Sequence, residues 1–242
     1  MNREYHKWFS ANLQKEMELL VFGHRGASVL FFPTRCAHFY DYENWKVIEA
    51  IQPKIEAGYV QLFCIDSVDK ESFYCHDCQP AEKILRYIQY EKYILEEVLP
   101  FINYKNPNSY TISAGCSMGA YHAVNIAFKH PDCFDKVIGM SGRYDLTRRI
   151  GIFSDLFNGY RNEDIYFNMP SFYIPNLTDP NILKLLSKME IILAVGQFDA
   201  FLINNKDLSD TLTKKGLKNE FYIWEHEAHN PLHWGKMLQL YL

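Results

Sequence analysis

Short apolar runs recur along the chain, each bounded by polar or turn-forming residues. In chain order they are "YVQLFCID" (59–66), "YTISAGC" (110–116), "DKVIGMSG" (135–142), "KMEIILAVGQFD" (188–199) and "EFYIWEHE" (220–227). Runs of this kind predict strands of a sheet, and the nearly continuous run 59–66 is typical of a parallel-sheet strand buried on both faces. Upstream, residues 16–34 predict two more strands, joined by a hairpin turn at "GHRGAS".

Between these runs, the apolar positions recur at helical spacing. The predicted helices are "AEKILRYIQYEKYILEEVLPFI" (81–102, ending near Pro100), "MGAYHAVNIAFKHP" (118–131), "NNKDLSDTLTKKG" (204–216) and a terminal helix beginning near Pro231. Residues 44–58 also have helical spacing, interrupted by Pro53 and stopped by Gly58.

The alternation of strands and helices predicts an α/β fold with a mostly parallel central sheet and helices on both faces. The chain shows no internal repeat, low-complexity tract or linker, so we expect one domain spanning residues 1–242.

One segment, approximately 147–187, lacks clean periodicity and is rich in aromatic residues, among them Phe153 and Tyr166. Long excursions in compact domains are often functional, so this segment is interpreted as an insertion or cap bordering a pocket, with Phe153 and Tyr166 as candidate substrate contacts. The alternative is a structural insertion that packs its own aromatic side chains.

Composition limits the classes of function. The 242 residues carry a formal net charge of −4 and no basic cluster, which argues against a nucleic-acid partner. No stretch resembles a secretory signal or a membrane span, so we expect a cytoplasmic protein without a membrane partner, and its six cysteines as thiols. "CHDC" (75–78) has no second cysteine pair and is interpreted as incidental.

The candidate nucleophile is Ser117, in "GCSMG". Glycines two residues before and after a serine permit a sharp strand-to-helix turn, and Ser117 lies where a predicted strand ends and a predicted helix begins. Such a turn lifts the hydroxyl clear of the sheet. The backbone N–H of Met118 would then point at the oxyanion formed during acyl transfer.

A serine needs a base, and three histidines follow the last predicted strand region: His226, His229 and His233. His229 is favoured as general base because it lies on the loop, whereas His226 still belongs to the strand end and His233 to the terminal helix. The spacing of "HEAH" is one residue short of a zinc-protease signature, so neither a metal nor a cofactor is expected.

Asp199 ends the strand before the last one and is the favoured acid, with Asp145 after the preceding strand as the alternative. The second oxyanion donor should be the backbone N–H of Thr34 or Arg35, in the loop after an early strand. In that loop, Arg35, Cys36 and His38 would face the substrate.

Taken together, these stretches resemble the esterase branch of the α/β-hydrolase superfamily, whose members include esterase D-like enzymes, feruloyl esterases and mycolyltransferases. The closer likeness is to bacterial cytoplasmic esterase/lipase superfamily proteins. The matching stretches span almost the whole chain: "FGHRGASVLFFPT", "LFCIDSVDKESFY", "YILEEVLPFI", "GCSMGAYHA", "YFNMPSFYIPNL" and "HNPLHWGKMLQLYL".

The resemblance implies an α/β-hydrolase fold with Ser117 as nucleophile, His229 as base, Asp199 as acid, and oxyanion donors at Met118 and around Thr34. Two stretches depart from the pattern. Asn230, Pro231, Leu232 and His233 follow the base where relatives carry an Asp-Trp-rich run, and Arg35 and Cys36 follow "FPT" where relatives carry small residues. Both changes touch the rim of the expected site.

We therefore expect a serine hydrolase that cleaves a small-molecule carboxylic ester or related acyl compound through an acyl-enzyme intermediate. Acyl transfer to an alcohol would use the same residues and is the first alternative. A non-catalytic binding protein on the same fold is the second.

Overall fold

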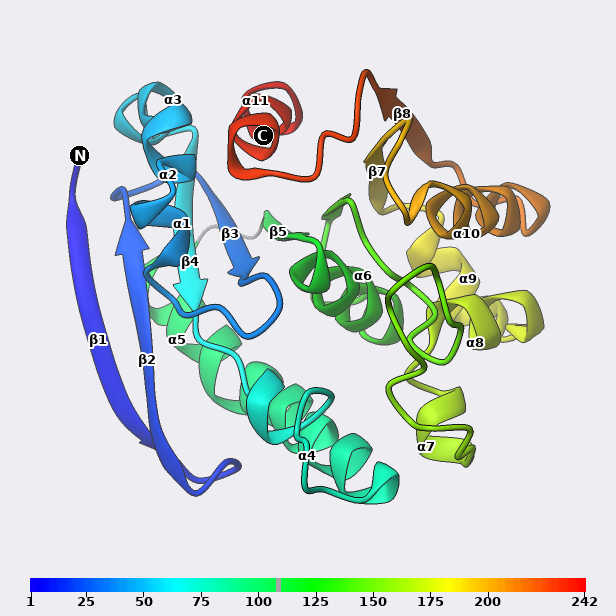
Figure 1. Cartoon of the computed structure of the whole chain (residues 1–242). Coiled ribbons are helices and arrows are strands. Elements are labelled where there is room, and N and C mark those ends of the chain that lie inside the picture. The colour runs from blue at the N-terminus through cyan, green and yellow to red at the C-terminus, as the bar shows by residue number, and fades with distance from the viewer. Residues whose placement is uncertain (108–109) are drawn as a thin grey trace.

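The computed structural model describes residues 1–107 and 110–242 and has at its centre a sheet of eight strands in the order β1-β2-β4-β3-β5-β6-β7-β8. Figure 1 shows the strands and the helices around them. The strands are β1 (Arg3–Ser10), β2 (Lys15–Phe22), β3 (Ala27–Phe32), β4 (Val60–Ile65), β5 (Thr111–Cys116), β6 (Lys136–Met140), β7 (Glu190–Gly196) and β8 (Glu220–Trp224).

From β4 to β8 all neighbouring strands run parallel, and only β1–β2 and β2–β4 are antiparallel. This confirms the predicted mostly parallel sheet. The predicted hairpin between β2 and β3 is wrong, because β4 lies between them and pairs with both. A turn signal in the sequence shows where the chain changes direction, but it does not show which strands pair. β3 is apolar and buried along almost its whole length, so it lies in the interior of the sheet and not beside β2.

Helices cover both faces of the sheet. They are α1 (Asp41–Asn44), α2 (Val47–Ala50), α3 (Gln52–Glu56), the 3₁₀ turn η1 (Asp69–Glu71), α4 (Pro80–Tyr93), the π-helical turn η2 (Ile94–Val98), α5 (Leu99–Lys105), α6 (Met118–Lys129), α7 (Glu163–Tyr166), α8 (Pro170–Asn176), α9 (Pro180–Leu186), α10 (Leu202–Lys214) and α11 (Pro231–Tyr241).

The apolar core is divided by the sheet into two clusters. One cluster packs α4, α5, α6, α8 and α10 against the sheet, and the other packs α1–α3 and α11 against its opposite face. Figure 1 shows α11 beside α1–α3, well apart from α4 and α5. Parallel strands are stable in this arrangement because both faces are shielded from water.

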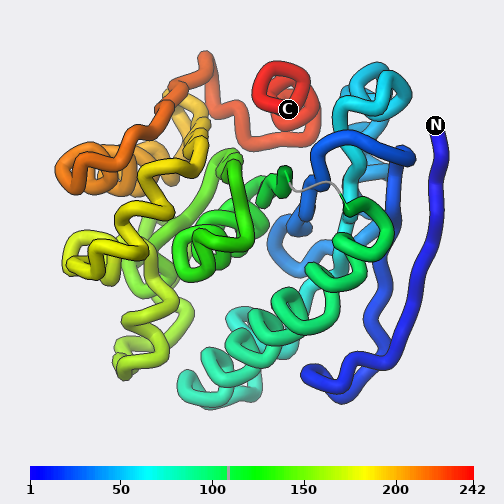
Figure 2. The backbone as a smooth tube through the Cα atoms, turned by 180° about the vertical axis from the view of Figure 1, so that it is seen from behind, coloured from blue at the N-terminus to red at the C-terminus, as the bar shows by residue number. Residues whose placement is uncertain are grey.

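The long predicted helix continues past Pro100 instead of ending there. Figure 2 shows α4, η2 and α5 as one rod along the side of the molecule. Pro100 lies in the first turn of α5, directly after the π-helical turn, where the regular i→i−4 hydrogen bonds are already interrupted. The missing N–H of the proline therefore costs little at this position.

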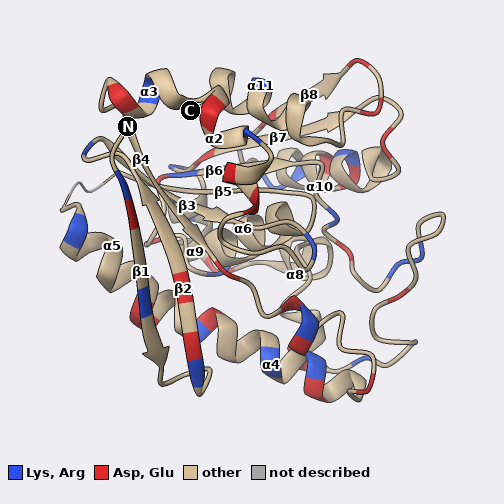
Figure 3. Ribbon diagram, turned by 60° about the vertical axis from the view of Figure 1, so that its left-hand side comes forward, with Lys and Arg blue, Asp and Glu red and all other residues tan. Residues whose placement is uncertain are grey.

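Strand β1 has no counterpart among the predicted elements. It pairs with β2 along its whole length, from Arg3 opposite Phe22 to Ser10 opposite Lys15. Because it is an edge strand, it mixes charged and aromatic residues, and Figure 3 shows acidic and basic positions along both β1 and β2. Charge on an edge strand discourages pairing with other chains, but it also hides the strand pattern.

The aromatic-rich segment 147–187 contains the three short helices α7, α8 and α9. Phe157, Ile165 and Ile174 are fully buried against the cluster that includes α6 and α10, so part of the segment is core. None of the helices in residues 1–107 and 110–242 has both the length and the apolar character that crossing a bilayer requires.

Candidate active site

Ser117 occupies a strained turn between β5 and α6. Its backbone angles are φ 55° and ψ −118°, a region that residues with side chains rarely adopt and that costs about 1–3 kcal/mol. The glycines on either side make the turn possible. A Cβ at Gly115 would collide with the backbone of Gly119, and a Cβ at Gly119 would lie 2.6 Å from the carbonyl oxygen of Pro33. The start of α6 therefore packs directly on the end of β3.

The buried side chain of Tyr42, in α1, joins the same two strand ends. Its hydroxyl donates to the carbonyl of Phe32 at 2.8 Å and accepts from the N–H of Cys116 at 3.2 Å. The ring stacks on Phe31 with centroids 4.0 Å apart, and burial raises the pKa of the Tyr42 hydroxyl well above its usual value. Tyr42 thus remains a neutral donor that fixes the spacing between β3 and the residue before Ser117.

His229 and Asp199 meet beside this turn. Nδ1 of His229 lies 2.9 Å from Oδ2 of Asp199, whose side chain is 1% exposed. The other carboxylate oxygen accepts from the N–H of Phe201 at 2.9 Å, so the aspartate is fixed from both sides. With Nδ1 turned toward the carboxylate, Nε2 is the ring nitrogen that remains for another partner.

The loop that carries His229 is sharply turned. His226 and Ala228 have positive φ angles of 63° and 51°. The loop ends at Asn230, whose side chain caps α11 by accepting from the N–H of His233 at 3.2 Å. The imidazole of His229 packs near the rings of Phe201 and Trp234, with centroids 5.8 Å and 5.5 Å away. These contacts hold the ring between β7 and α11.

The alternative residues lie elsewhere. Asp145 accepts from the backbone N–H and the hydroxyl of Thr147, at 2.9 Å and 2.7 Å. His226 and His233 border a separate groove between β8 and α11. In residues 1–107 and 110–242, no three His, Cys, Asp or Glu side chains are grouped so as to hold a metal ion together.

Ser117 and His229 line one cavity of about 370 Å³ at the carboxyl ends of the parallel strands, the usual position of sites in such sheets. Its walls are Thr34, Arg35, Trp45, Tyr74, Ser117, Met118, Arg143, Phe153, Phe201, His229 and Trp234. Of the expected substrate contacts, Phe153 and Arg35 are on this wall. Tyr166 borders a different hollow, and His38 faces Asp66 at 3.2 Å.

Several wall residues had no place in the sequence interpretation, and Arg143 is the most informative of them. It follows β6, so the rule that places active groups after strand ends applied to it as much as to Asp199. Tyr74, Trp45 and Trp234 come from three unrelated segments, and no local pattern marks them. Only the fold brings them together.

A buried pair behind the cavity fixes the loop after β3. Oδ2 of Asp69 accepts from the N–H of Cys36 at 2.9 Å, and Oδ1 lies 3.0 Å from Nε2 of His122. Both side chains are almost inaccessible, and His122 belongs to α6, the helix that begins after Ser117. The pair therefore links the turn of Ser117 to the loop that carries Thr34 and Arg35. Because the N–H of Cys36 is already used, the N–H groups of Thr34 and Arg35 are the ones left for a ligand.

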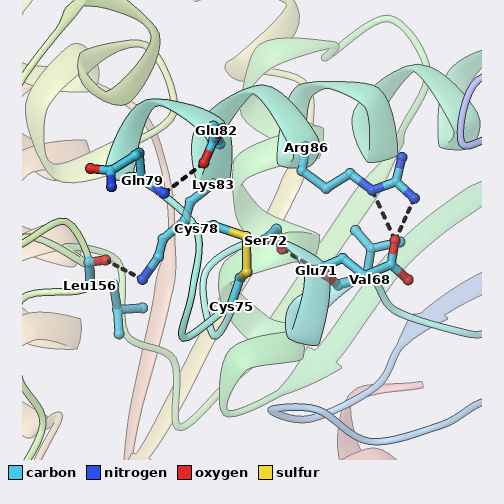
Figure 4. The surroundings of a disulfide bond; sticks show 10 residues. All are labelled: Val68, Glu71, Ser72, Cys75, Cys78, Gln79, Glu82, Lys83, Arg86 and Leu156. Carbon is cyan, nitrogen blue, oxygen red and sulfur yellow. Dashed lines mark hydrogen bonds and ion pairs between the residues drawn. A yellow bond between two sulfur atoms is a disulfide. The ribbon is translucent and has the colours of Figure 1, made fainter.

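The expectation that all six cysteines are free thiols is wrong for two of them. Cys75 and Cys78 form a disulfide, with their Cα atoms 5.5 Å apart, in the turn that leads into α4 (Figure 4). Cysteines three positions apart in a tight turn fall within the range that a disulfide needs, so "CHDC" is a covalent link and not an incidental match. The neighbouring Tyr74 is a wall residue of the cavity.

Comparison with known families adds to this geometry. The family described as "Putative esterase" matches residues 41–229, which include β4–β8, Ser117, Asp199 and His229. No protein with a curated description matches the sequence.

Among solved structures, a ferulic acid esterase superposes with a TM-score of 0.77 at 18% identity, over 100% of this chain and 96% of the other. An S-formylglutathione hydrolase from Agrobacterium tumefaciens gives 0.71 at 14% identity, over 98% and 93%. The fluorophosphonate-binding serine hydrolase F of Staphylococcus aureus gives 0.70 at 15% identity, over 99% and 96%. At these identities the likeness is one of fold.

Proposed function

Since the chain belongs to this esterase family and is an ester-hydrolysing serine hydrolase with the α/β-hydrolase fold, we propose that Ser117, His229 and Asp199 form its catalytic triad. One observation carries the proposal: Nδ1 of His229 contacts Oδ2 of Asp199 at 2.9 Å, and His229 lines the same cavity as Ser117. A buried carboxylate in this position holds the imidazole in one orientation and stabilises its charged form.

In the first half-reaction, Oγ of Ser117 attacks the carbonyl carbon of a carboxylic ester while Nε2 of His229 takes the hydroxyl proton. The carbonyl electron pair moves onto oxygen and forms an oxyanion. When this intermediate collapses, the C–O bond to the alcohol breaks. His229 gives its proton to the departing oxygen, and the acyl group stays on Ser117.

The oxyanion would be held by the N–H of Met118, at the start of α6, and by the N–H of Thr34 or Arg35. The first N–H groups of a helix have no partner within the helix, so that of Met118 is free to donate a hydrogen bond to a ligand oxygen. Thr34, Arg35 and Met118 all border the cavity, which supports this arrangement.

In the second half-reaction, water takes the place of the alcohol. His229 removes a proton from the water, whose oxygen attacks the acyl carbon, and the Ser117 ester bond breaks. His229 then returns the proton to Oγ, so that the carboxylic acid leaves and the enzyme is regenerated.

Labelling with a fluorophosphonate tests the nucleophile. We expect the wild-type protein to be labelled at Ser117 and the Ser117→Ala variant to be neither labelled nor active on 4-nitrophenyl esters. Ser141→Ala is the matched control, since Ser141 directly follows the adjacent strand β6 and also has a positive φ, of 56°, but lies outside the cavity wall. A wild-type protein that remains unlabelled would favour a binding protein on this fold.

A further inference from the structure

Two arginines form part of the cavity wall beside Ser117, and no carboxylate shares that wall. Arg35 follows β3 and Arg143 follows β6, while no aspartate or glutamate is among the wall residues. The protein as a whole has a formal net charge of −4, so this cavity differs in sign from the rest of the molecule. A concentration of one sign of charge in a cleft selects the opposite sign in its ligand.

The guanidinium of Arg143 is buried and forms no direct ion pair with a described residue, although the carboxylates of Asp145 and Asp155 act on its charge from farther away. The residue is 3% exposed, and Nη2 donates to the backbone carbonyls of Arg148 at 2.7 Å and Ser154 at 2.6 Å. Nε has no hydrogen-bond partner among the described residues. The arginines that form ion pairs in residues 1–107 and 110–242 are Arg3, Arg86, Arg148 and Arg161. Carbonyl groups orient the guanidinium of Arg143, but they do not neutralise it.

Arg35 and Arg143 act on the same point of the cavity wall, the side chain of Tyr74. The guanidinium carbon of Arg35 lies 5.6 Å from the Tyr74 ring centroid. Burial and the Asp69 carboxylate raise the pKa of the Tyr74 hydroxyl to about 12, while the positive charges of Arg143 and Arg35 act in the opposite direction. Both charges therefore lie close enough to the Tyr74 hydroxyl to act on it.

The topology of the sheet sets the two arginines around the nucleophile. β5, which directly precedes Ser117, lies between β3 and β6, and the arginines come from the loops after those two strands. An anionic group held between them is therefore a part of the substrate close to the ester carbonyl, and the cavity of about 370 Å³ limits that substrate to a small molecule.

We propose that the natural substrate is a small ester that carries a carboxylate, held by Arg35 and Arg143 while Ser117 attacks the ester carbonyl. This inference rests on the proposed function and names its substrate class. A planar guanidinium matches the geometry of a carboxylate, and a carboxylate between the two guanidinium groups would give Arg143 the direct ion pair that it does not form within the chain. A neutral ester would gain nothing from the two positive charges.

The test compares two esters that differ in charge and by one methyl group: 4-nitrophenyl hydrogen adipate, an anion at neutral pH, and 4-nitrophenyl methyl adipate. With the Ser117→Ala rate subtracted, we expect kcat/KM for the anion to exceed that for the neutral ester by about tenfold or more. Arg35→Gln and Arg143→Gln should each reduce this ratio to about threefold or less, and Arg35→Lys should retain part of it.

Arg3→Gln is the matched control. It removes one arginine charge that is paired with Glu43 and is not part of the cavity wall, and it should leave the ratio of the two rates unchanged. Because Arg143 also orients backbone carbonyls, thermal unfolding of each variant checks its fold. Arg35 is exposed, so Arg35→Gln remains a valid test even if Arg143→Gln unfolds.

Equal or faster hydrolysis of the neutral ester by the wild type would overturn the inference, as would a ratio that Arg35→Gln leaves unchanged. Failure of the proposed function looks different, because Ser117 would then resist the fluorophosphonate and neither ester would be hydrolysed.

Discussion

The hydroxyl of Tyr42 forms hydrogen bonds with the ends of both β3 and β5, so its loss should affect both strands. Tyr42→Phe keeps the ring stacked on Phe31 but leaves the buried N–H of Cys116 without its partner. We expect the free energy of unfolding to fall by about 1–3 kcal/mol and kcat to fall as well, because Cys116 directly precedes Ser117. Urea unfolding and steady-state kinetics measure the two effects. Tyr104→Phe, at an 84% exposed position, should change neither.

The two candidate acids can be separated by the same substitution at each. Asp199→Asn should lower kcat by about a thousandfold or more, because an amide no longer holds His229 in the required tautomer. Asp145→Asn should lower kcat by less than about tenfold, since the contacts of Asp145 are with Thr147 and not with a histidine. The reverse order of effects would transfer the role of acid to Asp145.

Asp69 acts on the loop after β3, which we propose holds the oxyanion, but it is not part of the cavity wall. Asp69→Ala removes the acceptor for the N–H of Cys36 and leaves His122 unpaired. We expect kcat to fall about tenfold to a hundredfold with little change in KM, since the loop would present its N–H groups less accurately to the oxyanion. Asp69→Asn keeps an acceptor for Cys36 and should restore part of the rate. A rise in KM at constant kcat would instead assign Asp69 to substrate binding.

At the scale of elements, the disulfide Cys75–Cys78 closes the turn between Tyr74 and α4. It directly precedes the N-cap of α4, Gln79, whose backbone N–H donates to the carboxylate of Glu82 at 2.7 Å (Figure 4). The turn thus fixes a cavity residue on one side and a helix start on the other.

Reduction of this disulfide should raise KM clearly, and it should lower the free energy of unfolding only a little. A loop of four residues gives up little chain entropy, so we expect a loss of about 2 kcal/mol or less in the free energy of unfolding. Tyr74, freed from its anchor, should bind substrate less well. Kinetics and thermal unfolding of the paired variant Cys75→Ser/Cys78→Ser, compared with the wild type, test both expectations. An unchanged KM would show that Tyr74 is positioned by packing alone.

The elements that the sequence predicts well are those whose environment is uniform. β4, β5, β6 and β7 are buried almost throughout, so their apolar runs are unambiguous. β1 is half exposed, and its alternation of charged and aromatic residues resembles a polar terminus. The pairing of β2 with β4 depends on residues about 40 positions apart, and no local pattern records such a contact.

At the scale of the whole molecule, a parallel sheet collects the ends of its strands at one edge. Chain order and strand ends were sufficient to single out Ser117, Asp199 and His229 as candidates before any coordinates. They were not sufficient for Arg143 or Tyr74, because the sequence interpretation took one acid and one base from the strand ends and left the other side chains there unassigned. Candidate catalytic residues are therefore easier to predict from sequence than the residues that line the cavity and determine which ligand it binds.

The position of His229 on the last loop, between β8 and α11, has a consequence for biosynthesis. The proposed nucleophile, Ser117, emerges from the ribosome long before the proposed base, His229. A nascent or prematurely terminated polypeptide that has completed β5 and α6 already displays its serine, yet it has no means of activating it. If the proposed triad is correct, a polypeptide that stops before His229 cannot hydrolyse an ester.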